Sequence, residues 1–139
     1  MVRFVTKHIA GLDGTGREQL VKVVKAVSAE AGLRHQQAED AREASEIEEG
    51  RKLIGTDSMR CSECHQFRKV DEDATAPSLT GYGSREWLIG IIANPKHERF
   101  YGPRSERMPA FGSDKILSEQ AIGLLADWLR GEWYEVERR

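Results

Sequence analysis

The amino-acid sequence predicts an all-α protein. Apolar residues recur at the spacing of a helix face in several segments, and capping residues and glycines bound these segments. The alternation that indicates a half-buried strand is essentially missing. The 139 residues are 39% hydrophobic and 32% charged, which suits one globular domain with an appendage. The formal net charge of −2 gives no bulk attraction to nucleic acid or to a membrane surface.

The first predicted helix follows a capping box at residues 15–18, in which Thr15 is the expected N-cap. Gly32 is its expected C-terminal stop. One apolar stripe runs along this helix and comprises Leu20, Val23, Val24 and Val27. We expect such an apolar stripe to be buried, either against the neighbouring domain or against the remainder of a longer parent protein.

A second helix is predicted over residues 36–54. It begins with acids and ends near Arg51 and Lys52, which matches the helix dipole. Residues 66–83 and 95–115 are predicted as long loops, and the first of them is punctuated by Pro77, Gly81 and Gly83.

Two further helices are predicted in the second half of the chain. Ser84 is a suitable N-cap for a helix over residues 85–93, which Pro95 stops. Ser118 caps a final helix that continues through Leu129.

The five residues Cys61-Ser62-Glu63-Cys64-His65 form the attachment signature of a c-type haem. On one turn of helix both thiols project to the same side, where they can form thioethers with the two vinyl groups of one porphyrin. His65 lies on the same face and can reach the iron as the proximal ligand. The expected cofactor is therefore one covalently attached haem c, held by Cys61, Cys64 and His65.

Three other interpretations of the two cysteines are weaker. A thioredoxin-like redox pair needs a strand just upstream, whereas that segment is charged and helical in pattern. A structural zinc site usually takes four Cys/His ligands at paired spacing, and here the remaining histidines His8, His35 and His97 are scattered singly. A plain disulfide is the third alternative.

The second axial ligand decides what a haem iron can do. Met108 follows His65 by enough chain to wrap one edge of the ring and return on its far side, and Pro109 stiffens the backbone beside it. Met59 lies on the attachment segment and cannot easily reach the opposite face. The alternatives are His97 as ligand, an open iron, or Met108 as ordinary core packing. With His65 and Met108 as metal ligands, the centre moves single electrons and has no vacancy for a substrate.

These motifs resemble the small single-haem cytochromes c of class I over roughly residues 46–131. The resemblance rests on the helix with Gly50, the haem signature, Ala76-Pro77-Ser78-Leu79-Thr80-Gly81, Met108-Pro109-Ala110-Phe111 and the terminal helix with Trp128. It implies a cytochrome c-like fold of about three core helices around one covalently bound haem, here with an extra N-terminal helical segment. It also implies that Gly50 meets Trp128, and that the Pro77 carbonyl accepts a hydrogen bond from the second nitrogen of His65.

A narrower resemblance is carried by residues 79–88, by Asn94-Pro95 and by Phe100-Tyr101-Gly102. These segments are similar to cytochrome c domains fused to respiratory-chain membrane subunits, such as those of cytochrome b-type complexes. We therefore expect residues 1–45 to be an N-terminal helical extension or linker from a larger protein, and residues 46–139 to be the cytochrome c domain.

The expected location is extracytoplasmic, because haem c is attached outside the cytoplasm. The chain shows neither an apolar export segment nor a stretch long enough to span a bilayer. We expect a module of a longer exported or membrane-bound protein, on the periplasmic side and tethered through parts that this chain does not include.

Other residues are expected near the haem. Leu79, Ile91, Ile92 and Phe111 are candidates for the apolar wall of the crevice. Trp87 is expected either to donate its indole N–H to a haem propionate or to pack in the core.

Basic residues around the predicted crevice have two interpretations each. Arg85 and Arg107 either neutralise propionates or lie on the solvated surface. The loop before Met108 carries Lys96, Arg99, Arg104 and Arg107, which either steer an acidic redox partner or belong to an ordinary mixed-charge loop.

The predicted function is electron transfer: the domain relays single electrons between partner proteins of a respiratory chain and is not itself an enzyme. The rival prediction is a haem-based catalyst or gas sensor with an open or weakly held sixth coordination site. The expected partners are redox proteins and the remainder of a membrane-bound respiratory subunit, and nucleic acid is not expected.

Overall fold

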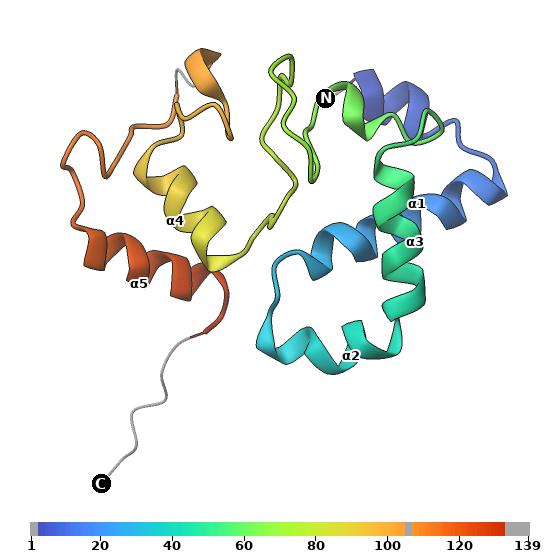
Figure 1. Ribbon diagram of the computed structural model, residues 1–139, viewed down its shortest axis with the longest axis horizontal. Helices are drawn as coiled ribbons and strands as arrows, with labels where there is room; N and C mark the ends of the chain where they lie inside the picture. The colour runs from blue at the N-terminus through green and yellow to red at the C-terminus, as the bar shows by residue number, and fades with distance from the viewer. Residues whose placement is uncertain (1–2, 105–106, 133–139) are drawn as a thin grey trace, which may run out of the picture.

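The computed structural model describes residues 3–104 and 107–132 (Figure 1). Within these ranges the protein is helical and contains no β-strand, only an isolated bridge between His65 and Ala76. The predicted all-α class is therefore confirmed. Residues 133–139 of the predicted domain lie outside the described ranges, and the domain division after residue 45 stays a prediction.

The helical elements follow one another with irregular connections between them. They are the π-helix η1 Phe4–Ile9, α1 Gly14–Ala29, the 3₁₀ turn η2 Arg34–Gln36, α2 Gln37–Arg42, α3 Ala44–Ile54, the 3₁₀ turn η3 Cys61–Glu63, α4 Arg85–Ala93, the 3₁₀ turn η4 Gly102–Arg104, and α5 Glu119–Leu129.

The prediction of one helix over residues 36–54 is wrong, because the chain breaks at Glu43. This residue has φ −99° and ψ 11° and separates α2 from α3. Its carboxylate accepts a hydrogen bond at 2.8 Å from Nζ of Lys25 on α1. The break changes the direction of the chain, so that α3 lies across α1 (Figure 1).

Side-chain caps decide where the longer helices begin. Asp13 caps α1, because its Oδ1 accepts a hydrogen bond from the Gly16 amide at 2.7 Å. The predicted cap at Thr15 is wrong, since α1 already begins at Gly14 and Thr15 lies inside its first turn. Ser84 and Ser118 cap α4 and α5 as predicted, each accepting a hydrogen bond at 3.2 Å from the amide three residues on.

Helices α1 and α3 cross at Gly50, and this crossing forms the first of two cores. A Cβ atom at Gly50 would overlap the carbonyl oxygen of Lys22 and lie 2.9 Å from Cβ of Ala26, so the approach requires glycine. The buried residues of this core are Val23, Ala26, Ile54 and Met59. Leu20, Val23 and Val27 of the α1 stripe therefore pack into a core that this chain itself completes, whereas Val24 is 59% exposed.

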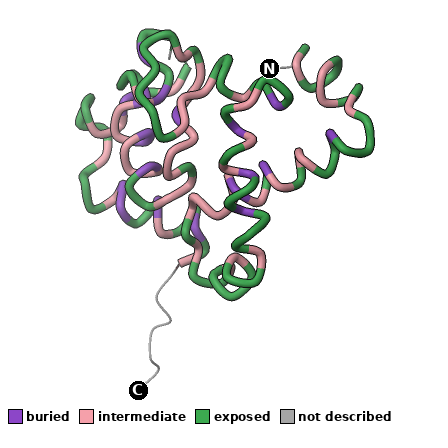
Figure 2. Tube along the Cα trace, turned by 45° about the vertical axis from the view of Figure 1, so that its right-hand side comes forward, coloured by how far each residue is buried: buried purple, intermediate pink, exposed green. Residues whose placement is uncertain are grey.

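Helices α4 and α5 pack together and form the second core (Figure 1). Figure 2 shows the buried residues of the described chain in purple. Its buried residues are Trp87, Ile91, Ile92, Phe100 and Ile122. The rings of Trp87 and Phe100 meet edge to face with centroids 5.4 Å apart, a favourable geometry for two aromatic rings.

The expected contact between Gly50 and Trp128 is wrong. The face of α3 at Gly50 is occupied by the backbone of α1, and Trp128 on α5 is 62% exposed. Figure 1 shows the two helices on opposite sides of the segment that connects the cores.

Arg130 fastens the end of α5 to the segment that follows α1 and to the segment that precedes α4. Its guanidinium is buried and donates hydrogen bonds to the carbonyl oxygens of Ala31 at 2.6 Å and Gly83 at 2.8 Å. Glu132 accepts from the same group at 3.1 Å and balances its charge. The two cores are thus joined by a hydrogen-bonded charge in addition to the connecting chain.

None of the helices in the described ranges is long and apolar enough to cross a membrane.

We expect Gly50→Ala to destabilise the protein by about 1–3 kcal/mol, the usual cost of overpacking a close contact. The added methyl group would force α1 away from α3. Denaturant unfolding followed by circular dichroism measures the effect. Gly14→Ala is the matched control, because a Cβ there meets no atom within 4 Å. Equal unfolding midpoints for both variants would show that α1 does not rest against Gly50.

Candidate functional site

The Cys-x-x-Cys-His segment follows the first core directly. Met59 is 1% exposed and anchors the chain in that core. Arg60 then adopts a left-handed conformation with φ 54°, and the 3₁₀ turn η3 begins at Cys61. The amide of His65 donates to the Cys61 carbonyl at 3.0 Å, which closes the turn. The segment is therefore a tight turn with one end fixed in the core.

Both cysteines carry free thiols. Cys61 is half-buried and packs against the first core, whereas Cys64 is exposed. Burial raises the pKa of the Cys61 thiol, so it stays protonated at neutral pH. The structure thus offers two separate thiols rather than a disulfide. The raised pKa of Cys61 is the opposite of what an activated redox thiolate has.

The His65 ring is oriented by a hydrogen bond that the resemblance to class I cytochromes c implied. Its Nδ1 lies 2.7 Å from the carbonyl oxygen of Pro77. A carbonyl can only accept, so Nδ1 carries the proton and donates it. Nε2 of a neutral imidazole is then left with a free lone pair, which is the form that binds a metal ion. The expected contact between His65 and Pro77 is confirmed.

The loop that carries Pro77 is tied closely to the segment around His65. The amides of Thr75 and Ala76 both donate to the Cys64 carbonyl, at 3.0 Å and 2.9 Å. The amide of Leu79 donates to the Gln66 carbonyl at 2.9 Å. The stretch of residues 64–66, which includes His65, and the stretch of residues 75–79, which includes Pro77, are therefore held side by side.

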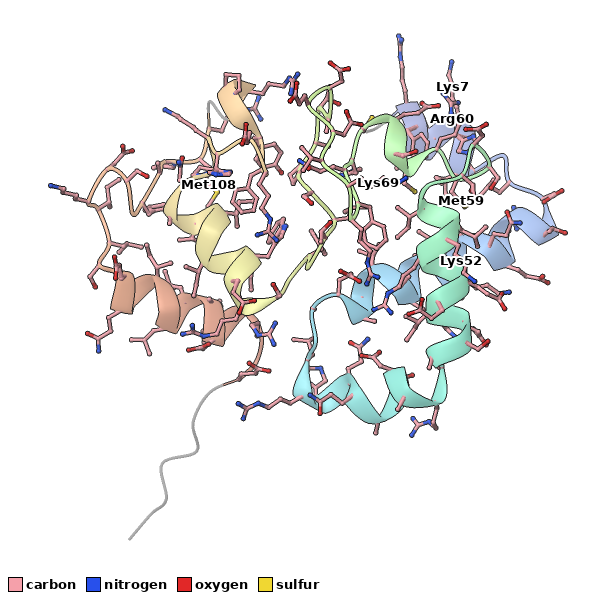
Figure 3. The ribbon with its side chains drawn as sticks, in the orientation of Figure 1. Lys7, Lys52, Met59, Arg60, Lys69 and Met108 are labelled. Carbon is pink, nitrogen blue, oxygen red and sulfur yellow. The ribbon has the colours of Figure 1, made fainter. Side chains whose placement is uncertain are left out.

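A groove of about 560 Å³ opens beside His65. Ile54, Phe67 and Val70 supply apolar surface to it. Its charged lining consists of the basic residues Arg51, Lys52, Arg68 and Lys69 and the acids Glu48 and Asp71; Figure 3 labels Lys52 and Lys69. Local sequence patterns did not indicate this basic rim, because its members come from α3 and from the loop after His65.

The predicted site residues divide between the two cores. Cys61 and Leu79 pack against the core of α1 and α3. Met108 and Phe111 pack against the core of α4, which includes Ile91. Met108 and Met59 accordingly lie on opposite sides of the connecting segment (Figure 3).

Trp87 does not present its indole N–H to the surface. The side chain is 6% exposed, and Nε1 donates to the Ser78 carbonyl at 2.9 Å. The expected contact with a propionate is therefore wrong, because the indole N–H already donates its hydrogen bond to the backbone of the loop. The alternative of core packing is confirmed.

Three of the basic residues singled out from the sequence have partners within the protein. Arg85 pairs with Asp127 on α5 at 2.7 Å. Arg99 donates to the Thr80 carbonyl at 2.9 Å, and Arg104 donates to the Ala74 carbonyl at 3.3 Å. Lys96 and Arg107 are exposed. Arg99 and Arg104 thus help to hold the Pro77 loop.

One acidic residue that the sequence did not single out lies behind this loop. Glu30, at the end of α1, has a side chain only 8% exposed. It accepts hydrogen bonds from Arg68 and from the Gly81 amide, each at 2.9 Å. Burial opposes its charge, but the hydrogen bonds from Gly81 and Arg68 and the nearby guanidinium groups hold its pKa below the ordinary value. No motif could have indicated this residue, since its partners are distant in sequence.

In residues 3–104 and 107–132, His, Cys, Asp and Glu side chains do not gather in threes in a way that could hold a metal ion. No family model, no curated protein and no solved structure matches the chain.

We expect Trp87→Phe to destabilise the protein by about 1–3 kcal/mol, because the buried Ser78 carbonyl would lose its donor. Denaturant unfolding is the measurement. Trp128→Phe makes the same change on an exposed side chain and should move the midpoint little. Similar losses for the two variants would contradict the role given to the indole N–H.

Proposed function

We propose that this protein is a single-haem cytochrome c of class I that transfers electrons. The observation that carries the proposal is the hydrogen bond from Nδ1 of His65 to the Pro77 carbonyl at 2.7 Å, within a Cys-x-x-Cys-His segment. This bond selects the imidazole tautomer and ring orientation that an axial ligand needs.

The donor set suits a covalently attached haem. Cys61 and Cys64 are free thiols on one tight turn, and their sulfurs would form the two thioethers. His65 would supply the proximal nitrogen, while Leu79, Ile91 and Phe111 would supply apolar surface. The haem iron, when bound, exchanges one electron between its ferrous and ferric states.

Met108 is the proposed distal ligand. It is half-buried beside the α4 core, in a loop that Pro109 stiffens. A thioether favours ferrous iron and so raises the reduction potential. With His65 and Met108 both bound to the metal, neither oxygen nor a substrate has a free coordination position. This is the reason to prefer an electron carrier, which is not itself an enzyme, over a haem-based catalyst or gas sensor.

The proposed partners are other redox proteins and the remainder of a respiratory membrane subunit. The supporting sequence feature is the similarity of residues 79–88, Asn94-Pro95 and Phe100-Tyr101-Gly102 to cytochrome c domains fused to such subunits. The proposed location follows from the cofactor, since haem c is attached on the periplasmic side.

The direct test is expression in a host that matures c-type cytochromes. The purified protein should be red, should keep its haem in acidified organic solvent, and should show the sulfur-to-iron charge-transfer band when oxidised. Colourless protein would refute the proposal. Red protein that binds carbon monoxide or cyanide rapidly without denaturant would favour the catalyst or sensor.

We expect Met108→Ala to keep its haem covalently attached, to lose the charge-transfer band and to bind carbon monoxide rapidly. Its potential should fall, because the ligand that favours ferrous iron is gone. Potentiometric titration and visible spectra measure both effects.

Met59→Leu is the control, since this side chain is buried in the other core. The substitution conserves volume and should leave the band and the potential unchanged. A Met108→Ala protein with an unaltered potential would mean that the distal ligand is another residue.

A further inference from the structure

Glu30 brings together three segments that are far apart in sequence. One carboxylate oxygen accepts from Nη2 of Arg68 at 2.9 Å and from Nε of Arg51 at 3.3 Å. The other oxygen accepts from the Gly81 amide at 2.9 Å. The carboxylate thus links the end of α1 to α3 and to both ends of the loop that follows His65. A nearly buried carboxylate with three donors is strongly held, because leaving it unpaired is costly.

Arg68 transmits this restraint across the loop. Its backbone φ is 56°, a conformation that a non-glycine residue keeps only where its surroundings hold it. The guanidinium is held by Glu30, and the backbone amide donates to Oγ1 of Thr80 at 2.7 Å. Glu30 therefore acts on the Thr80–Gly81 corner twice, once directly and once through Arg68.

The Thr80–Gly81 corner is connected to His65 through the short stretch that begins at Pro77. Pro77 lies three residues before Thr80, and the stretch between them is fixed by the bond from the Leu79 amide to Gln66 and by the bond from Arg99 to the Thr80 carbonyl. His65 directs its Nδ1 at the Pro77 carbonyl, at the near end of this stretch.

We propose that Glu30 is a positioning residue, which holds the Pro77 loop in place and thereby fixes the orientation of the His65 imidazole. The inference rests on the proposed function, in which His65 is the proximal ligand. It assigns a role to the N-terminal segment, for which the sequence offered no motif. Helix α1 would then help to orient His65, through Glu30 at its end, in addition to packing against α3.

A simpler role for Glu30 would be to hold α1 against α3 through Arg51. Other ion pairs already do this without touching the loop. Lys25 of α1 pairs with Glu43 at 2.8 Å and with Glu46 at 2.7 Å. Glu46→Gln is therefore a matched control, which removes one carboxylate from the contact between the helices and leaves the Pro77 loop untouched.

The test is hydrogen exchange by NMR on the reduced, haem-loaded protein. In Glu30→Gln, the Nδ1 proton of His65 and the Gly81 amide should exchange about tenfold faster than in the wild type, equivalent to about 1.4 kcal/mol of local opening. The Ile91 amide, in the other core, should be unchanged. Glu46→Gln should leave all three rates unchanged. Arg68→Ala should act like Glu30→Gln, and its 51% exposed side chain makes it a mild substitution for folding.

Two results would overturn the inference. In one, the Gly81 amide accelerates while the His65 proton does not, so the loop is not coupled to the ring. In the other, all three protons accelerate together, so Glu30 contributes only to global stability. Failure of the proposed function can be distinguished from failure of this inference, because colourless wild-type protein would be seen before any variant was compared.

Discussion

The close approach of α1 and α3 at Gly50 is the constraint on which the rest of the structure depends. Because glycine has no Cβ, the backbone of α1 lies directly on α3. That approach places the end of α1 beside the loop after His65, so that Glu30 reaches Arg68 and Gly81. A larger residue at position 50 would separate the helices and would move this carboxylate away from its partners.

The two cores are held together by hydrogen bonds as well as by the connecting chain. Each core has a short helix pair and its own buried residues, and each contributes some of the predicted site residues. Arg130 donates to the Ala31 carbonyl next to α1 and so ties the second core to the first. Its bond to Gly83 and the bond from Trp87 to Ser78 tie the second core to the connecting segment. Directional bonds of this kind fix relative position more strictly than apolar packing does, and the proposed site, with ligands from both cores, would need that precision.

Some of the candidate site could be predicted because its signals are local. The Cys-x-x-Cys-His turn and the caps at Ser84 and Ser118 involve residues a few positions apart. The prediction of the bond between His65 and Pro77 rested on the family resemblance and not on residue spacing. The partner of Trp87 could not be predicted from the sequence, since a buried indole N–H can donate to any nearby acceptor and only the folded loop shows which one is within reach.

The sequence by itself determined the helical class, the ends of α4 and α5, and the chemistry available between Cys61 and His65. Only the tertiary structure decided which helix lies against Gly50, where residues 36–54 break, and which carboxylate lies behind the Pro77 loop. The physical reason is range. Caps, turns and attachment motifs depend on neighbours along the chain, whereas helix docking and buried charge pairs depend on partners that only folding brings together.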